Sequence, residues 1–309
     1  MKELVDRLLQ GDRRALARLI SLVEDRDLRS REIIDKVFPH TGRACRLGIT
    51  GPPGAGKSTV VDRLVPLLRG DYNRIGILAC DPSSPFSQGA LLGDRIRMRG
   101  IAQEEHVFIR SMATRGALGG LARAAQEAAL VLEAAGFDLI VFETVGVGQA
   151  EVDIVEAADS VVVVLTPQSG DAIQAMKAGL MEIADILVVN KSDQGGADAA
   201  LQNLESVLRL ASGEWRPPVI RASAEGGEGM PELKGALDRH RLYLEGGPLL
   251  ARRRARLRGF LRGIIEEELE LRLWDEKALA ALDNRIEELL EHQASPYQTA
   301  KELLKELGG

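Results

Sequence analysis

The stretch Gly48-Ile-Thr-Gly-Pro-Pro-Gly-Ala-Gly-Lys-Ser-Thr59 decides the fold of this chain. It contains Gly51-x4-Gly56-Lys57-Ser58, a complete match to the phosphate-binding loop pattern G-x4-G-K-[ST]. The residues before the loop form a short apolar run, and residues 58–68 carry the apolar spacing of a helix. A strand, a glycine-rich loop and a helix N-terminus in this order make a cradle of backbone N–H groups for phosphate. The stretch therefore predicts a nucleotide-phosphate site.

Within this loop every residue from 51 to 59 is expected to border the phosphates. The Lys57 ammonium would bridge the β- and γ-phosphates, and the Ser58 hydroxyl would ligate Mg²⁺. The nucleotide-binding candidates in the loop are Gly51, Pro52, Pro53, Gly54, Ala55, Gly56, Lys57, Ser58 and Thr59.

Strand-like apolar runs alternate with helical patterns from residue 46 to about residue 245. The runs at 161–165 and 186–189 are continuously apolar, which is typical of parallel strands covered on both faces. We therefore predict an α/β fold with a doubly wound, mostly parallel sheet and a ligand beyond the carboxyl ends of the strands. The expected strands are 46–50, 75–80, 107–110, 138–143, 160–166, 186–190 and 218–223.

Helical patterns flank this central region on both sides. Residues 1–38 predict two or three short amphipathic helices, and Gly246-Gly-Pro248 predicts a hinge before helices at 249–273, 276–292 and 296–307. The run 252–258 is basic, while an apolar stripe is supplied by Leu257, Leu261, Ile264 and Ile265. This stripe belongs either to a core or to a dimerisation arm. The expected division is a helical segment (1–42), a P-loop domain (43–246) and a C-terminal arm (247–309).

Composition narrows the classes of function. The chain has 309 residues, a net charge of −6 and only 4% aromatic residues, so neither nucleic acid nor an anionic membrane is a favoured partner. No apolar run approaches the ~20 residues of a membrane span, and no signal or transit pattern opens the chain, which predicts a cytoplasmic protein. Cys45 and Cys80 form no C-x-x-C pair and are expected to be small buried hydrophobes.

The sequence Asn190-Lys191-Ser192-Asp193 follows the strand expected at 186–190. The Asp193 carboxylate can accept hydrogen bonds from guanine N1–H and the 2-amino group, whereas adenine would leave it unpaired. Asn190 would connect the motif to the base and the phosphate loop, and the Lys191 stem would lie over the purine ring. Together with the phosphate loop, this motif predicts GTP rather than ATP as the ligand.

The segment Glu143-Thr144-Val145-Gly146 ends the strand expected at 138–143. P-loop proteins place here an acid that reaches Mg²⁺ and a glycine whose N–H meets the γ-phosphate. Val147 stands where many GTPases carry a Gln that orients water, so we expect slow intrinsic hydrolysis or a water held by another group. Gln149 is a candidate for that group, with a simple polar loop residue as the alternative.

Two further acids, Asp81 and Asp94, follow the strand expected at 75–80. Either could complete the Mg²⁺ shell, although each could instead serve a turn or a helix N-cap. The loop 166–177 could report the nucleotide state to a partner or merely connect two elements. Ser223 and Ala224 follow the last expected strand and are base-contact candidates. The candidate metal ligands are Ser58, Asp81, Asp94 and Glu143, and the candidate catalytic residues are Lys57, Asp81, Asp94, Glu143 and Gln149.

On these motifs the chain resembles the MeaB/ArgK/MMAA family of G3E P-loop GTPases. The similarity runs through GPPGAGKST, DPSSPFSQGALLGDRIRM, RSMATRGALGGLA, FETVGVGQAEVDI, GDAIQAMKAG-LMEIADI and NKSD. Glu143 in place of Asp is the substitution that gives the class its name. By the family's pattern, Asp81, Asp94 and Glu143 surround the metal, and Asn190 to Asp193 hold guanine. The same pattern implies three switch loops, at 81–100, 143–155 and 167–177.

This resemblance implies a GTP- and Mg²⁺-dependent chaperone that gates adenosylcobalamin loading from an adenosyltransferase. It also implies protection or reactivation of methylmalonyl-CoA mutase, or of a related B12-dependent acyl-CoA mutase, by a homodimer. Two alternatives remain open. A nickel-type metal-insertion GTPase would share the phosphate loop, although such proteins carry Cys/His metal motifs. A nucleotide-dependent scaffold with negligible turnover would fit Val147.

Overall fold

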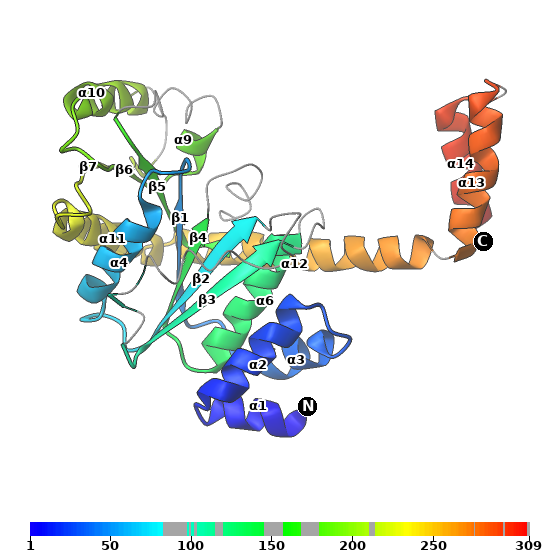
Figure 1. Cartoon of the computed structure of the whole chain (residues 1–309), viewed down its shortest axis with the longest axis horizontal. Coiled ribbons are helices and arrows are strands. Elements are labelled where there is room, and N and C mark those ends of the chain that lie inside the picture. Colours follow the sequence, from blue (N-terminus) through cyan, green and yellow to red (C-terminus); the bar gives the residue numbers. More distant parts are fainter. Residues whose placement is uncertain are drawn as a thin grey trace. The chain divides into compact units, whose positions relative to one another are not determined.

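Seven parallel strands form one sheet in the part of the chain that the computed structural model describes. The described residues are 1–82, 98, 100–101, 104–114, 120–144, 157–167, 179–209, 214–274, 276–292 and 294–307. The strands are β1 Cys45–Thr50, β2 Ile75–Pro82, β3 Val107–Thr114, β4 Leu139–Thr144, β5 Ser160–Leu165, β6 Ile186–Val189 and β7 Val219–Arg221. All paired neighbours run parallel in the order β3-β2-β4-β1-β5-β6-β7 (Figure 1). The predicted doubly wound parallel sheet is confirmed.

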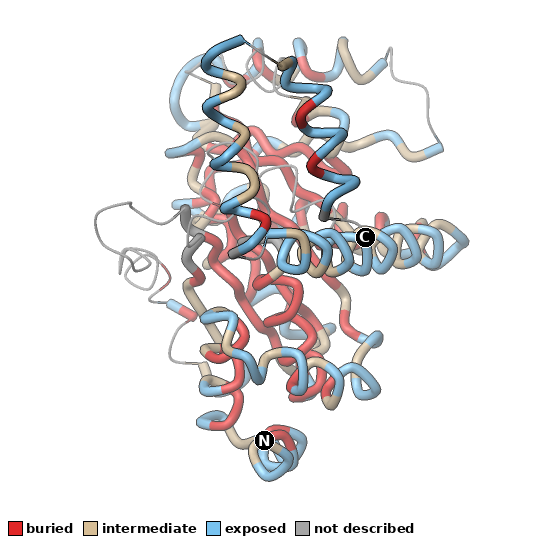
Figure 2. Tube along the Cα trace, turned by 90° about the vertical axis from the view of Figure 1, so that its right-hand side faces the viewer, coloured by how far each residue is buried: buried red, intermediate tan, exposed pale blue. Residues whose placement is uncertain are grey.

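Helices cover both faces of the sheet, which explains why its central strands are continuously apolar. On one face, α4 (Lys57–Leu68) and α11 (Met230–Glu245) share a core with Ile49, Ile77 and Val164. On the other face lies α6 (Gly120–Ala134), so close that a Cβ on Gly76 would fall 2.8 Å from Leu132. Figure 2 shows the central strands buried along most of their length, whereas the edge strand β7 is intermediate to exposed. Two further helices among the described residues of this region are α9 Leu180–Ile183 and α10 Ala197–Leu208.

Three short helices and one 3-10 turn precede the sheet, as the sequence predicted: α1 Lys2–Leu9, α2 Arg13–Glu24, α3 Ser30–Val37 and η1 Phe38–His40. The Asp12 side chain caps α2 by accepting from the N–H groups of Arg14 and Ala15 at 2.8 and 3.1 Å. Arg110 on β3 pairs with Glu24 and donates to Ser21 on α2. Helices this short are marginal alone, so these contacts and burial against α6 hold them on the sheet.

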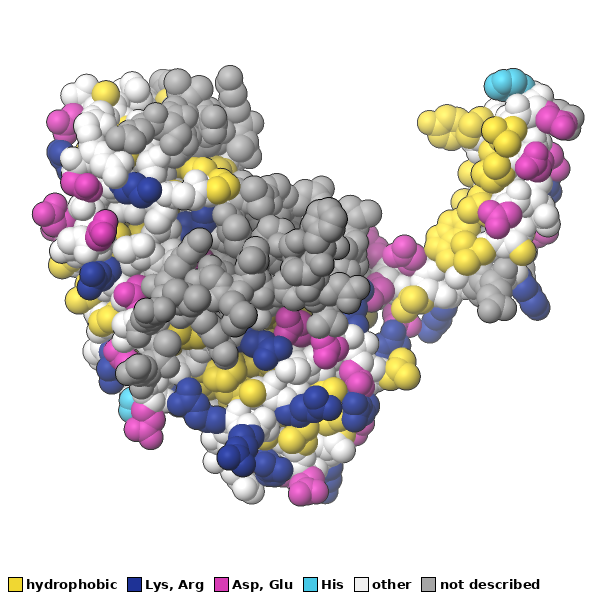
Figure 3. All heavy atoms as spheres, in the orientation of Figure 1, with side chains coloured by type: hydrophobic (Ala, Val, Ile, Leu, Met, Phe, Trp, Pro, Cys, Tyr) yellow, Lys and Arg dark blue, Asp and Glu magenta, His cyan; other side chains and the backbone are white. Residues whose placement is uncertain are grey.

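The chain divides into two compact units, residues 1–254 and 255–309. The C-terminal helices are α12 Pro248–Leu273, α13 Glu276–Leu290 and α14 Pro296–Leu307, close to the predicted ranges. In the second unit, α13 packs against α14, and apolar side chains gather along one side of this pair (Figure 3). On α12, exposed apolar side chains recur every four residues at Leu257, Leu261, Ile265 and Leu269. Within the described residues, no helix combines the length and apolarity that crossing a membrane requires.

Candidate active site

The phosphate-binding loop lies at the centre of the sheet, at its carboxyl edge. It runs from the end of β1 at Thr50 to the start of α4 at Lys57, and β4 and β5 flank β1. Gly51 and Gly56 have φ angles of +139° and +89°, which L side chains rarely adopt. A Cβ on Gly51 would lie 2.0 Å from the carbonyl oxygen of Val164. The loop can therefore pass over β5 only because this position is glycine.

Lys57 is buried at the first turn of α4 and folds back over the loop. Its Nζ donates to the carbonyl oxygens of Gly51 and Pro52 at 2.7 and 2.9 Å. A buried ammonium needs such acceptors, and phosphate oxygens would serve the same need better because they carry charge. The structure thus places the one buried lysine of the described residues against the backbone of the predicted phosphate cradle.

Ser58 and Glu143 lie together across the interface between α4 and β4. The Ser58 hydroxyl donates to Glu143 Oε1 at 2.5 Å, and the Glu143 side chain is buried. Next to this pair, the Thr144 hydroxyl donates to the Thr50 hydroxyl at 2.9 Å. A hydroxyl and a carboxylate are the hard oxygen donors that Mg²⁺ prefers, and these two stand beside the phosphate loop. Two of the four candidate metal ligands are therefore brought together.

Asn190 joins the predicted guanine loop to the phosphate loop. Its Nδ2 donates to the Ala55 carbonyl at 2.8 Å, and its Oδ1 accepts from the Ala224 N–H at 3.0 Å. A Cβ on Gly56 would lie 2.4 Å from Asn190 Nδ2, so glycine is needed here for the two loops to meet. One buried amide thus connects three segments that are far apart in the sequence.

Asp193 is exposed at the rim of this junction, and Ser223 holds it in place. The buried Ser223 hydroxyl donates to Asp193 Oδ1 at 2.8 Å. Lys191 has a φ of +56°, an uncommon conformation for a non-glycine residue. This turn lets Asn190 reach inward while Asp193 faces outward. Asn190, Lys191, Asp193, Ser223 and Ala224 therefore lie around one corner of the sheet, as a base-binding loop requires.

Several predicted site residues fall outside what the structure describes. Asp94, Gly146 and Gln149 are among them, as are most residues of the three expected switch loops. Asp81 is placed only as backbone at the end of β2, where it pairs in register with Ala113. Their proposed roles stay predictions. The sequence motifs also missed one participant, Val164, which shapes the loop through its backbone carbonyl alone and so leaves no side-chain signal.

Comparison with known proteins identifies the family to which this chain is similar. The family model described as methylmalonyl Co-A mutase-associated GTPase MeaB matches residues 16–278 of this chain. A Pyrococcus abyssi protein named as a GTPase is 48% identical, over 99% of this chain and 97% of its own length. The mouse protein named methylmalonic aciduria type A homolog, mitochondrial, is 36% identical, over 85% of this chain and 68% of its own length.

A solved structure shares the whole architecture. The crystal structure of a LAO/AO transport system kinase superposes with a TM-score of 0.76 at 30% sequence identity, covering 100% of this chain and 97% of that one. The similarity therefore extends from the N-terminal helices to the C-terminal ones, well beyond the loops that form the site.

Proposed function

The chain belongs to the MeaB family of GTPases, and from this premise we propose that it serves as the GTP-driven chaperone of a B12-dependent acyl-CoA mutase. The family match over residues 16–278 carries the proposal, because the family is described by its association with methylmalonyl-CoA mutase. The mouse relative, named for methylmalonic aciduria, supports the same client. In this role the protein gates the loading of adenosylcobalamin from an adenosyltransferase and protects or reactivates the mutase. We place it in the cytoplasm.

Nucleotide binding begins at the phosphate loop. The backbone N–H groups of Gly51 and of residues 54–59 surround the β-phosphate at the N-terminus of α4, where the helix dipole favours negative charge. Lys57 exchanges its contacts with the Gly51 and Pro52 carbonyls for oxygens of the β- and γ-phosphates. This exchange stabilises the charge that develops on the γ-phosphate during transfer to water.

The Ser58 hydroxyl and the Glu143 carboxylate, which are hydrogen-bonded to each other, are the oxygen donors that would hold a Mg²⁺ ion beside the phosphates. Asp81 and Asp94 are proposed to complete its shell. Bound there, the ion supplies positive charge that neutralises the β- and γ-phosphate oxygens. Glu143 also lies at the end of β4, directly before the segment 145–155, so the position of its carboxylate is coupled to a loop that we propose to switch with the nucleotide.

Guanine specificity resides in Asp193. Its carboxylate is oriented by Ser223 and accepts hydrogen bonds from guanine N1–H and the 2-amino group. Asn190 transmits the position of the base loop to the phosphate loop through Ala55. Because Val147 cannot orient water, we propose slow hydrolysis by the protein alone, with Gln149 or the client mutase completing the arrangement around the attacking water.

We further propose that the C-terminal arm, residues 247–309, forms a homodimer. The stripe Leu257, Leu261, Ile265 and Leu269 on α12 is about half exposed at every position, and such a stripe is stabilised when a second copy covers it. Leu261→Glu in the full chain should convert the dimer to a monomer in light scattering, while Arg258→Gln, a polar position on the same helix, should not. If the protein remains a dimer with both Leu261→Glu and Ile265→Glu, the proposal that the C-terminal arm forms the dimer interface is wrong.

The test of function is the rate of GTP hydrolysis with and without a purified B12-dependent mutase from the same genome. We expect a clear increase in rate with the client and none with the Lys57→Ala variant plus client. In parallel, transfer of adenosylcobalamin from the adenosyltransferase to the mutase should depend on GTP. Turnover that no mutase changes would assign the GTPase to a different partner. Binding of GTP with negligible turnover in all mixtures would favour the scaffold alternative.

A further inference from the structure

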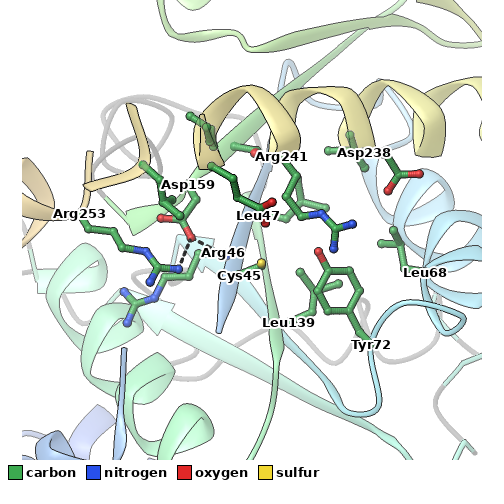
Figure 4. A pocket seen from close by; sticks show the side chains of 15 residues that line it. Cys45, Arg46, Leu47, Leu68, Tyr72, Leu139, Asp159, Asp238, Arg241 and Arg253 are labelled. Carbon is green, nitrogen blue, oxygen red and sulfur yellow. Dashed lines mark hydrogen bonds and ion pairs between the residues drawn. The ribbon is translucent and has the colours of Figure 1, made fainter. Parts of the chain in front are cut away.

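A cavity opens at the amino edge of the sheet, where the strands begin, opposite the phosphate loop. It lies between the first residues of β1, β4 and β5 and the helices α11 and α12, and it encloses about 570 Å³ including its open mouth (Figure 4). The apolar part of its wall comes from six leucines, Leu47, Leu68, Leu139, Leu237, Leu244 and Leu249, and polar and charged side chains supply the rest. An apolar cavity with a few converging polar groups is the usual form of a small-molecule site.

Arg241 on α11 supplies a positive charge to this cavity. Its guanidinium lies over Tyr72, 6.0 Å from the ring centroid, and its Nε is buried with no hydrogen-bond acceptor. Among the described residues, no carboxylate approaches Arg241 within ion-pair distance. Asp238 on the same helix pairs instead with Lys234 at 2.8 Å, and Glu245, one turn further on, acts on Arg241 only at longer range.

Two of the polar groups that line the cavity beside Arg241, Tyr72 and Cys45, are neutral. Burial raises the pKa of the Tyr72 phenol and of the Cys45 thiol, so both stay protonated at neutral pH. Asp159, at the far side, lies 3.6 Å from the Arg253 guanidinium and accepts from the Arg46 N–H at 3.1 Å. The negative charge of Asp159 is therefore offset locally by Arg253. The Arg241 guanidinium is therefore a half-buried positive charge at one end of the leucine-lined cavity.

We propose that this cavity binds a small molecule with an apolar chain and a carboxylate end. The chain lies among the leucines, and the carboxylate accepts hydrogen bonds from the Arg241 guanidinium, which is suited to planar carboxylates. The Tyr72 hydroxyl adds a neutral donor beside it. The cavity is a site separate from the nucleotide, because its lining residues on β1, Cys45 to Leu47, lie four to six residues before Gly51, which is about 13–20 Å at about 3.3 Å per residue.

Leu249 and Arg253, in the first turns of α12, line the cavity together with α11. A ligand here would therefore touch the start of the helix that leads into the C-terminal arm. Nothing in the nucleotide chemistry uses this cavity, so the proposal stands or falls independently of the client mutase.

The test is calorimetric titration of the full chain with octanoate, 1-octanol and acetate. We expect one saturable octanoate site per chain, with octanol and acetate each at least about tenfold weaker, because each lacks one half of the recognition. Arg241→Gln should weaken octanoate about tenfold and leave octanol unchanged. The matched control is Arg239→Gln, an exposed arginine on the same helix, which should bind octanoate as the wild type does. Unchanged GTP hydrolysis in both variants verifies that they fold.

A second variant separates the cavity from other apolar surfaces. Leu249→Trp should fill the space and abolish octanoate binding, whereas Leu261→Glu, on the exposed stripe of α12, should leave it intact. The proposal is overturned if octanoate shows no saturable binding to the wild type. It is equally overturned if Arg239→Gln weakens binding as much as Arg241→Gln, or if only Leu261→Glu removes it.

Discussion

The two edges of the sheet are built from the same strands and carry opposite chemistry. At the carboxyl edge, glycine loops and small polar side chains join one another through short hydrogen bonds, as Asn190 does between Ala55 and Ala224. At the amino edge, α11 and α12 close over the strands with leucines and long charged side chains. The first edge exposes backbone N–H groups to a ligand, and the second buries ion pairs. Function at one edge and anchoring at the other can therefore be altered separately.

Replacement of Lys57 in the phosphate loop should have the largest effect of any change at the carboxyl edge of the sheet. Lys57→Ala should lower the rate of GTP hydrolysis by about 1,000-fold, because it removes the charge that stabilises the transferring phosphoryl group. Its thermal stability should stay close to that of the wild type, since the ammonium donates to carbonyls of its own loop, those of Gly51 and Pro52. Steady-state phosphate release and a thermal melt measure the two effects.

Lys36→Ala is the control for this change, because the ion pair that Lys36 makes within the described part of the chain is with Glu32 on the surface of α3. We expect wild-type hydrolysis from it. If Lys57→Ala turned over GTP at the wild-type rate, the assignment of the phosphate loop would be wrong.

The two edges of the sheet differ in how well the sequence predicts them. The difference depends on how far apart in the sequence the interacting residues lie. The strands and helices were predicted within a few residues, because continuous apolar runs such as 161–165 require burial on both faces. The phosphate and guanine loops could be predicted because each is a short pattern at a strand end. The cavity and its cation were not predicted. Cys45, Tyr72 and Arg241 lie on three separate elements, and no local spacing connects them.

The same reason explains the gaps within the nucleotide site. Asn190 and Asp193 could be assigned from one motif, but the carbonyl of Val164 that requires a glycine at position 51 could not. The ion pair of Asp185 with Arg252 joins residues 67 positions apart and has no motif. Motifs formed by neighbouring residues can be recognised in the sequence. Contacts between residues that are far apart in the chain can be identified only in the structure.

Exchange of the base-reading acid tests the rim of the carboxyl edge. Asp193→Asn should weaken GTP binding roughly 100-fold, because its amide cannot accept both guanine hydrogen bonds. It should bind xanthosine triphosphate better than the wild type does, since the amide can donate to the 2-oxo group. Competition binding of the two nucleotides measures the switch. Asp198→Asn, an exposed acid on α10 that pairs with Arg221, should bind GTP normally; equal GTP affinity in all three proteins would refute base reading by Asp193.

The amino edge is tested at Asp185, which follows α9 and precedes β6. Its carboxylate accepts two hydrogen bonds from Arg252 at 2.6 and 2.8 Å and one from the Val161 N–H at 2.9 Å. His240 Nε2 lies 3.2 Å away, and the Ser160 hydroxyl bonds the other ring nitrogen at 2.8 Å. Asp185→Asn keeps the shape but sets an amide against the guanidinium. It should cost about 2 kcal/mol, at the low end for a buried pair because Arg252 is partly exposed.

That loss should lower Tm by about 4–8 °C, whereas the exposed control Asp198→Asn should leave it within about a degree. GTP hydrolysis per folded molecule should not change, which separates this edge from the Lys57 variant. A melt of Asp185→Asn that coincides with the wild type at pH 7 would show that the Arg252 pair contributes no stability.

The pH dependence of this difference identifies its origin. Burial raises the pKa of the Asp185 carboxyl, but the hydrogen bonds from Arg252 and the approach of His240 outweigh burial and hold the pKa below its ordinary value of 3.8. A carboxyl whose pKa is lower in the folded state stabilises the fold fully above its unfolded pKa, and this stability is lost as pH falls through the folded one. The gap between wild type and Asp185→Asn in urea unfolding should therefore stay constant from pH 7 to pH 5 and close only below pH 3.8. A gap that closed already between pH 7 and pH 5 would contradict the assignment of the effect to the Asp185 carboxyl.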